Sequence, residues 1–176
     1  GAHPLRAAAL PHVRELAEAS GETAALGLYD PVRRQTCVVA VVESDAPVRY
    51  VSKLHEWRDL HTGASGRAVM AFLPEDERRA IVERTRLAPA TEHTITSADE
   101  LEQVLAGVRE RGYAFSQEER RLGGVGIAAP VFGPGGLVGG VGGVSVPTLR
   151  FVPDDEPRLA RLVTTCARRI TEAIGG

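Results

Sequence analysis

A short run of small residues, from Gly63 to Gly66, is the first candidate for ligand chemistry in this chain. Its backbone amides lead into a segment of small and apolar residues that favours a helix. Free N–H groups at a helix start, together with the helix dipole, can bind a carboxylate without any cationic side chain. An ordinary helix start that binds only water explains the local sequence equally well. The run therefore indicates either an anion-binding site or a plain helix N-terminus.

Ser65, within this run, is also a candidate nucleophile, because His61 lies four residues before it. A catalytic serine needs a base within hydrogen-bond reach and an acid that orients the base. The sequence has no G-x-S-x-G motif and no evident orienting acid. We therefore expect Ser65 to cap the following helix with its side chain. A hydrolytic enzyme stays open as an alternative, with its residues drawn from Ser65, Ser116, Ser145, His61 and Glu119.

Two other kinds of site lack the residue spacing that they require. The segment from Gly124 to Ala129 fits the dinucleotide pattern G-x-G-x-x-G/A, but Pro130 and β-branched residues follow where a helix should start. The histidines show no metal-binding spacing, so we expect them to be surface or hydrogen-bonded residues. They are His3, His12, His55, His61 and His93. We expect no metal, no catalytic residue and no cofactor.

The C-terminal third of the chain is rich in glycine where its other residues favour strands. Ten of the 19 glycines lie between residues 123 and 143, among valines and isoleucines of high strand propensity. Glycine weakens a strand, because it costs backbone entropy and offers no side chain to pack. Glycines in strands therefore often mark places where another backbone or a ligand comes close. We expect two paired strands here to leave a hollow that receives a small molecule.

The hydrophobic pattern predicts the elements that must position these residues: a helix, three strands, three helices, three strands and a final helix. We expect helices over 5–20, after Gly66, from Pro74, from Ser97 to Gly112 and from Pro153 onward, and strands over 23–30, 35–43, 48–54, 112–117, 124–133 and 137–146. Ser97 and Glu100 form a capping box, and Gly135-Gly136 a tight turn. This order favours an α+β fold with about six antiparallel strands flanked by helices.

Composition indicates one soluble domain over residues 1–176. Hydrophobic residues make up 43% and charged residues 25%, which is ordinary for a globular protein. The net charge of −2 is not that of a nucleic-acid-binding domain. No apolar run is long enough to span a bilayer, and there is no secretory signal. Cys37 and Cys166 are expected to be buried free thiols, so we expect a cytoplasmic protein without a membrane partner.

Two segments, Gly112–Glu119 and Ile127–Phe132, resemble the signature of IclR-type transcriptional regulators. Leu60-His61 followed by Gly66-Arg67-Ala68 resembles another part of the family pattern. The resemblance covers essentially the whole chain and implies the C-terminal effector-binding domain of such a regulator, with a GAF-like fold. In the family an N-terminal winged helix-turn-helix domain binds DNA. Nothing in this chain reads as that domain, so we expect the full-length protein to carry it upstream.

The same resemblance implies the ligand and the assembly. The effector is expected to be a small carboxylate or an aromatic acid. The protein is expected to form homodimers or tetramers in which ligand binding changes the arrangement of domains or subunits. By position, the amides of Ala64 and Ser65 would contact the carboxylate. Tyr50 would form a wall of the site. The other implied effector-binding residues are Ser116, Gly126, Gly143 and Ser145.

This sequence departs from the family pattern at positions that matter for the ligand. Gly126 stands where the signature has Cys, Ser or Ala, and Gly143 where some members carry a serine. Ser116 stands where other members have an aspartate, and Asp59 takes a usual proline position. The two missing side chains predict fewer donors and more room, and therefore a ligand bulkier than a two- or three-carbon acid. A GAF-like dimerisation module without a ligand is a third hypothesis.

Overall fold

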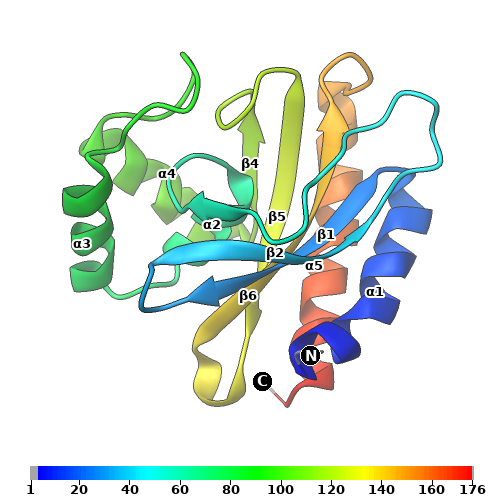
Figure 1. Cartoon of the computed structure of the whole chain (residues 1–176), viewed down its shortest axis with the longest axis horizontal. Coiled ribbons are helices and arrows are strands. Elements are labelled where there is room, and N and C mark those ends of the chain that lie inside the picture. The colour runs from blue at the N-terminus through cyan, green and yellow to red at the C-terminus, as the bar shows by residue number, and fades with distance from the viewer. Residues whose placement is uncertain (1–3, 176) are drawn as a thin grey trace.

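The computed structural model describes residues 4–175, in which a curled six-stranded sheet carries helices on both faces (Figure 1). The strand order is β3-β2-β1-β6-β5-β4, and every neighbouring pair is antiparallel. The strands are β1 (Thr23–Asp30), β2 (Gln35–Val42), β3 (Trp57–Asp59), β4 (Ala114–Gln117), β5 (Gly124–Phe132) and β6 (Val138–Pro147). The helices are α1 (Pro4–Ser20), α2 (Ala64–Met70), α3 (Glu75–Thr85), α4 (Ala98–Arg111) and α5 (Glu156–Ala173). The predicted α+β class and element order are confirmed.

One predicted strand is in the wrong place. Residues 48–54 form no strand, and the third strand is β3, whose Trp57 pairs with Cys37 of β2. The valines and leucine of the predicted strand are exposed, so their alternation does not mark a buried face. The loop 43–56 is tied down by side chains instead, because the Thr23 hydroxyl donates a 2.6 Å hydrogen bond to the carbonyl of Tyr50.

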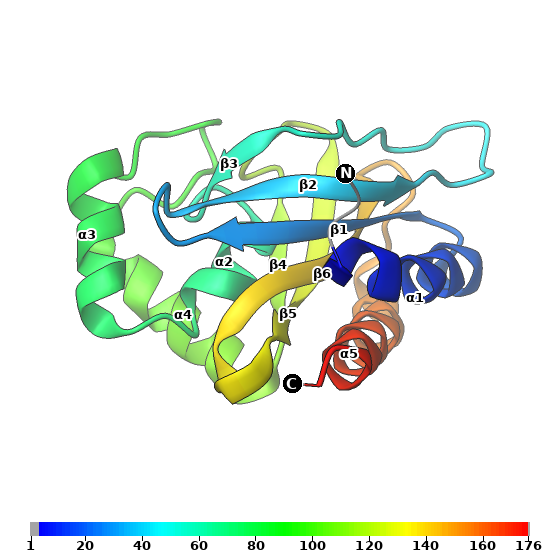
Figure 2. The same cartoon turned by 60° about the horizontal axis from the view of Figure 1, so that its bottom comes forward.

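One face of the sheet is covered by α1 and α5, which lie side by side (Figure 2). The buried residues of α5 recur at helical spacing and pack on the apolar side chains of β5 and β6. They include Leu159, Val163, Cys166 and Ile170. No helix of residues 4–175 is long and apolar enough to cross a membrane.

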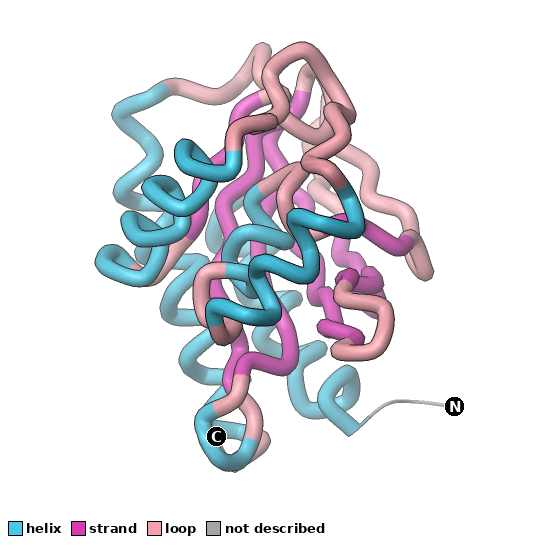
Figure 3. The backbone as a smooth tube through the Cα atoms, turned by 90° about the vertical axis from the view of Figure 1, so that its left-hand side faces the viewer, coloured by secondary structure: helices cyan, strands magenta, loops and turns pink. Residues whose placement is uncertain are grey.

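The other face carries α2, with α4 and α3 stacked outside it (Figure 3). Ser97 accepts a 3.3 Å hydrogen bond from the amide of Glu100 and so caps α4 as predicted. Gly66 brings α2 close to the preceding segment, since a Cβ at this position would lie 2.5 Å from the Leu60 carbonyl oxygen. The close approach fixes the first turn of α2 over β5 and β6, beside the site described next.

Candidate functional site

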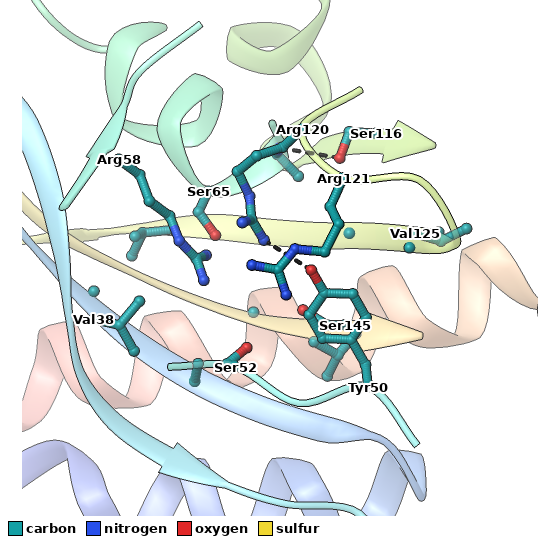
Figure 4. Close-up of a pocket in the computed structure, with 18 of the residues that line it drawn as sticks. Val38, Tyr50, Ser52, Arg58, Ser65, Ser116, Arg120, Arg121, Val125 and Ser145 are labelled. Carbon is teal, nitrogen blue, oxygen red and sulfur yellow. Dashed lines mark hydrogen bonds between the residues drawn. The ribbon is translucent and has the colours of Figure 1, made fainter. Parts of the chain in front are cut away.

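A cavity lies between the first turn of α2, the strands of the sheet and the loop 43–56 (Figure 4). Its wall draws on all six strands at the concave face, so the curl of the sheet creates it. All seven positions expected to bind an effector line this one cavity, although they come from five separate parts of the chain. They are Tyr50, Ala64, Ser65, Ser116, Gly126, Gly143 and Ser145.

The first turn of α2 differs in detail from the prediction. The helix starts at Ala64, so extended Gly63 takes the N-cap position and Ser65 lies inside the helix. The prediction that Ser65 caps this helix is therefore wrong. The amide of Ala64 donates a 3.1 Å hydrogen bond to the Ser116 hydroxyl, which gives this amide a protein partner. The Ser65 hydroxyl lines the cavity and has no hydrogen-bond partner among residues 4–175.

Three arginine side chains point into the cavity, and sequence reasoning did not select them. Arg58 comes from β3, and Arg120 and Arg121 from the loop before β5 (Figure 4). Arg58 is only 9% exposed. Burial first, and then the nearby charge of Arg120, lower the pKa of Arg58 to about 10. The Nε of Arg58 has no hydrogen-bond partner within the part of the chain that the structure describes.

Glu56 is the acid that faces all three of these arginines. Its carboxylate lies 3.8 Å from Arg58, 3.7 Å from Arg120 and 4.0 Å from Arg121. At these distances the groups form ion pairs but no hydrogen bonds, and the Oε2 atom of Glu56 has no hydrogen-bond partner among residues 4–175. Glu119 also lines the cavity, but it is paired elsewhere. The cluster therefore keeps an excess of positive charge.

Tyr50 belongs to the loop 43–56 and forms part of the cavity wall. Its hydroxyl accepts a 3.2 Å hydrogen bond from Arg120, and the guanidinium of Arg121 lies 5.7 Å from its ring centre. A Cβ added at Gly124 would lie 2.7 Å from the ring, so glycine at this position makes room for Tyr50. The aromatic ring, two cations and a glycine thus form one packed side of the site.

The prediction that the two strand glycines leave room for a ligand is wrong at Gly143. A Cβ at Gly143 would lie 2.6 Å from the Ile127 carbonyl oxygen, so this glycine serves the close approach of β5 and β6. A Cβ at Gly126 would lie 3.1 Å from the Ser116 hydroxyl and 3.3 Å from the Cβ of Ala64. The free volume is about 50 Å³, and one water molecule needs about 10–15 Å³ of such volume. The cavity therefore holds a few water molecules or a small ligand.

The residues of the alternative hydrolytic site do not come together. His61 is fully buried outside the cavity wall, and its Nε2 lies 2.8 Å from the Ala88 carbonyl oxygen. Glu119 binds Arg67 through both carboxylate oxygens. Within residues 4–175, no serine of the cavity is hydrogen-bonded to a histidine, and no cluster of acids, histidines and cysteines could hold a metal ion. His3 lies outside the described residues.

Comparison with known proteins places this domain in a family. The family model described as bacterial transcriptional regulator IclR C-terminal matches residues 1–172. The HTH-type transcriptional regulator KdgR of Escherichia coli (strain K12) is 33% identical over 163 residues, which are 93% of this chain and 61% of that protein. The glycerol operon regulatory protein of Streptomyces griseus is 34% identical over 175 residues, which are 98% of this chain and 67% of that protein.

Solved structures agree with the sequence match. The Thermotoga maritima IclR structure superposes with a TM-score of 0.92 at 28% identity, covering 99% of this chain and 70% of that one. The C-terminal domain of Escherichia coli KdgR gives a TM-score of 0.85 at 31% identity, covering 98% of this chain and 99% of that one. Fold and sequence together define a domain of bacterial transcription regulators.

The chain belongs to the IclR family and corresponds to the C-terminal domain of its members. The named relatives are transcriptional regulators rather than enzymes. The chain spans about three fifths of the length of the KdgR protein that it matches, 61%. The activity of a longer protein is therefore considered below as a proposal.

Proposed function

We propose that this chain is the effector-sensing domain of an IclR-type transcriptional regulator, and that its effector is a small organic acid. The observation that carries the proposal is the convergence of Arg58, Arg120 and Arg121 on the cavity that the seven expected positions line. Guanidinium groups bind carboxylates through paired, charge-assisted hydrogen bonds. A cavity with three of them favours an anion over a neutral ligand.

Electrostatics supports an anionic ligand. A buried charge is costly unless it is paired and hydrogen-bonded. Arg58 is buried, its Nε lacks a hydrogen-bond partner in the described chain, residues 4–175, and its pKa is lowered to about 10 by burial and by Arg120. An acid bound beside Arg58 would supply an acceptor for that Nε and a negative charge in addition to that of Glu56. The hydroxyls of Ser65 and Tyr50 would add polar contacts that orient the acid.

Sensing follows if the acid binds one arrangement of the regulator better than another. A ligand shifts an equilibrium between two states only through its different affinity for them. In our proposal the two states are arrangements of a homodimer or tetramer, and a winged helix-turn-helix domain upstream of this one contacts DNA. The regulator would act in the cytoplasm, where that DNA lies.

The two alternatives find less support. A serine hydrolase needs a base, and His61 is buried with its Nε2 against a carbonyl oxygen. Stoichiometric labelling of Ser65, Ser116 or Ser145 by a fluorophosphonate would nevertheless establish the enzyme. A module without a ligand would be expected to fill its cavity with side chains, whereas this one keeps free volume beside unpartnered polar groups.

Calorimetry and thermal shift on the purified chain test the proposal. The panel holds small acids, among them glyoxylate, pyruvate, malonate and benzoate, each beside its neutral amide. We expect at least one acid, and no amide, to bind saturably and raise the melting temperature. The double variant Arg120→Gln/Arg121→Gln should lose this binding, and Arg161→Gln, an exposed arginine of α5, should keep it. Equal binding of acids and amides, or binding that survives the double variant, would refute the proposal.

A further inference from the structure

We propose that the ligand of this cavity is a dianion, either a phosphate ester or a dicarboxylate, rather than a monocarboxylate. The inference rests on the proposed function and specifies the charge of the effector. It follows from the charges around the cavity, the hydrogen bonds that they leave unmade, and the size of the free space.

The charge balance of the cavity calls for two negative charges. Arg58, Arg120 and Arg121 carry three positive charges, and among residues 4–175 Glu56 is the one carboxylate within 4.0 Å of each of them. Glu119, the acid on the cavity wall, is neutralised by buried Arg67 at 2.9 Å. Two positive charges remain without a partner. A monoanion would leave one of them uncompensated in a partly buried site, where charge interactions are strong.

The unmade hydrogen bonds point the same way. Each guanidinium has five N–H donors in a fixed fork. Among residues 4–175 the Nε of Arg58 has no acceptor, and the side chain of Arg120 donates its hydrogen bond to the Tyr50 hydroxyl. Glu56 lies too far for hydrogen bonds to any of the three arginines. A doubly charged group, or two carboxylates, presents enough acceptors for several of these donors at once.

The free volume limits the ligand to a small dianion. About 50 Å³ is available between the arginines and an aliphatic wall that includes Val38, Val141 and Val144. That space suits a phosphate or a short dicarboxylate, with its few carbon atoms against the valines. A phosphate ester and a dicarboxylate share the charge that the site requires, so the experiment must separate them.

Two pairs of probes separate charge from shape. Methyl phosphate is a dianion at pH 8 and methyl sulfate is a monoanion of the same shape, because the second pKa of a phosphate monoester is about 6. Malonate and monomethyl malonate form the corresponding carboxylate pair. Each affinity is measured by calorimetry on the whole chain at constant ionic strength. We expect the dianion of at least one pair to bind at least about tenfold tighter, as for an added hydrogen bond to a charged group.

The pair whose dianion binds tighter shows whether the ligand is a phosphate ester or a dicarboxylate. Variants show which arginine is responsible for the preference for the dianion. Arg121→Gln, at an arginine that is 43% exposed and so tolerant of substitution, should shrink the preference for the dianion about tenfold. Arg161→Gln should leave the preference unchanged. If the monoanion bound as tightly as the dianion, or more tightly, in both pairs, the proposal of a dianionic ligand would be refuted, whereas the proposed function would be unaffected. Absence of binding by every acid, including the wider panel, would overturn both.

Discussion

Arg67, which is almost fully buried, forms a bidentate ion pair with Glu119, which lines the cavity. Arg67 Nη1 lies 2.9 Å from Oε1 of Glu119, and Nη2 lies 3.2 Å from Oε2. Arg67 is 1% exposed and also donates to the Phe115 carbonyl oxygen at 2.9 Å. The pair joins α2 to the edge of the sheet at β4, so it fixes two walls of the cavity relative to each other.

Removal of one partner of this pair should destabilise the fold strongly. Glu119→Gln leaves the buried guanidinium of Arg67 without its counter-charge, which typically costs about 3–5 kcal/mol. Urea denaturation would measure the free energy of unfolding. Glu75→Gln is the matched control, because Glu75 pairs with Arg79 on the exposed surface. Similar losses in the two variants would show that the buried pair has no special structural role.

Glycine 143 should be necessary for the pairing of β5 with β6. Gly143→Ala places a methyl group 2.6 Å from the Ile127 carbonyl oxygen, and the strands must shift to admit it. Overpacking of this kind typically costs about 1–3 kcal/mol. Gly139→Ala in the same strand meets no atom within 4 Å and should be neutral or stabilising. A melting temperature unchanged in Gly143→Ala would contradict the assigned close approach.

The Ser116 hydroxyl should stabilise the start of α2. It accepts the hydrogen bond from the amide of Ala64, so Ser116→Ala leaves that buried amide without an acceptor. We expect the free energy of unfolding to fall by about 1–3 kcal/mol in chemical denaturation. Ser145→Ala, at the position that pairs with Gly126, removes a hydroxyl that has no hydrogen bond among residues 4–175 and should change little. The reverse order of the two effects would count against this assignment.

The thiol of Cys166 should be unreactive in the folded protein. Burial chiefly raises its pKa to about 12 from a usual value of 9.0. The stability that comes from keeping the Cys166 thiol neutral and buried is therefore complete below pH 9. It is lost as the pH rises toward 12, because the thiol of the unfolded protein ionises at a lower pH than that of the folded protein. In a Cys37→Ser variant, a thiol-specific disulfide reagent at pH 8 should label Cys166 only on unfolding. Rapid labelling of the native variant would contradict its burial.

Local sequence signals were sufficient for most of the fold. Strands and helices with clear periodicity and end signals were predicted correctly, as for the Ser97 cap of α4 and the two φ-positive glycines that turn β5 into β6. The prediction of a third strand over 48–54 failed because Val48, Val51 and Leu54 alternate as in a strand but are exposed to solvent. Their loop is held by hydrogen bonds to distant side chains, such as Thr23, which no local pattern records.

The cavity that the expected residues share could be located from the sequence, but its charge could not. Family resemblance selected residues that share one cavity. Arg120 and Arg121 lie between the two signature-like segments, but a loop arginine is ordinarily solvated, and only the fold brings both beside Arg58. The role of Gly143 was mistaken because a strand glycine serves a ligand or a neighbouring backbone equally well in sequence. A Cβ at Gly143 would lie 2.6 Å from the Ile127 carbonyl oxygen, so this glycine accommodates the neighbouring backbone.

The most direct test of the central claim, that this cavity binds a small acid, is an NMR titration of the ¹⁵N-labelled chain. The best acid of the panel is added while backbone amide and arginine Nε signals are recorded. We predict saturable shifts concentrated at Ser65, Gly126, Ser145 and the Nε groups of Arg58 and Arg120, all on the cavity wall. Shifts that fail to saturate, or that fall on exposed arginines such as Arg161 while the cavity signals stay fixed, would contradict the claim.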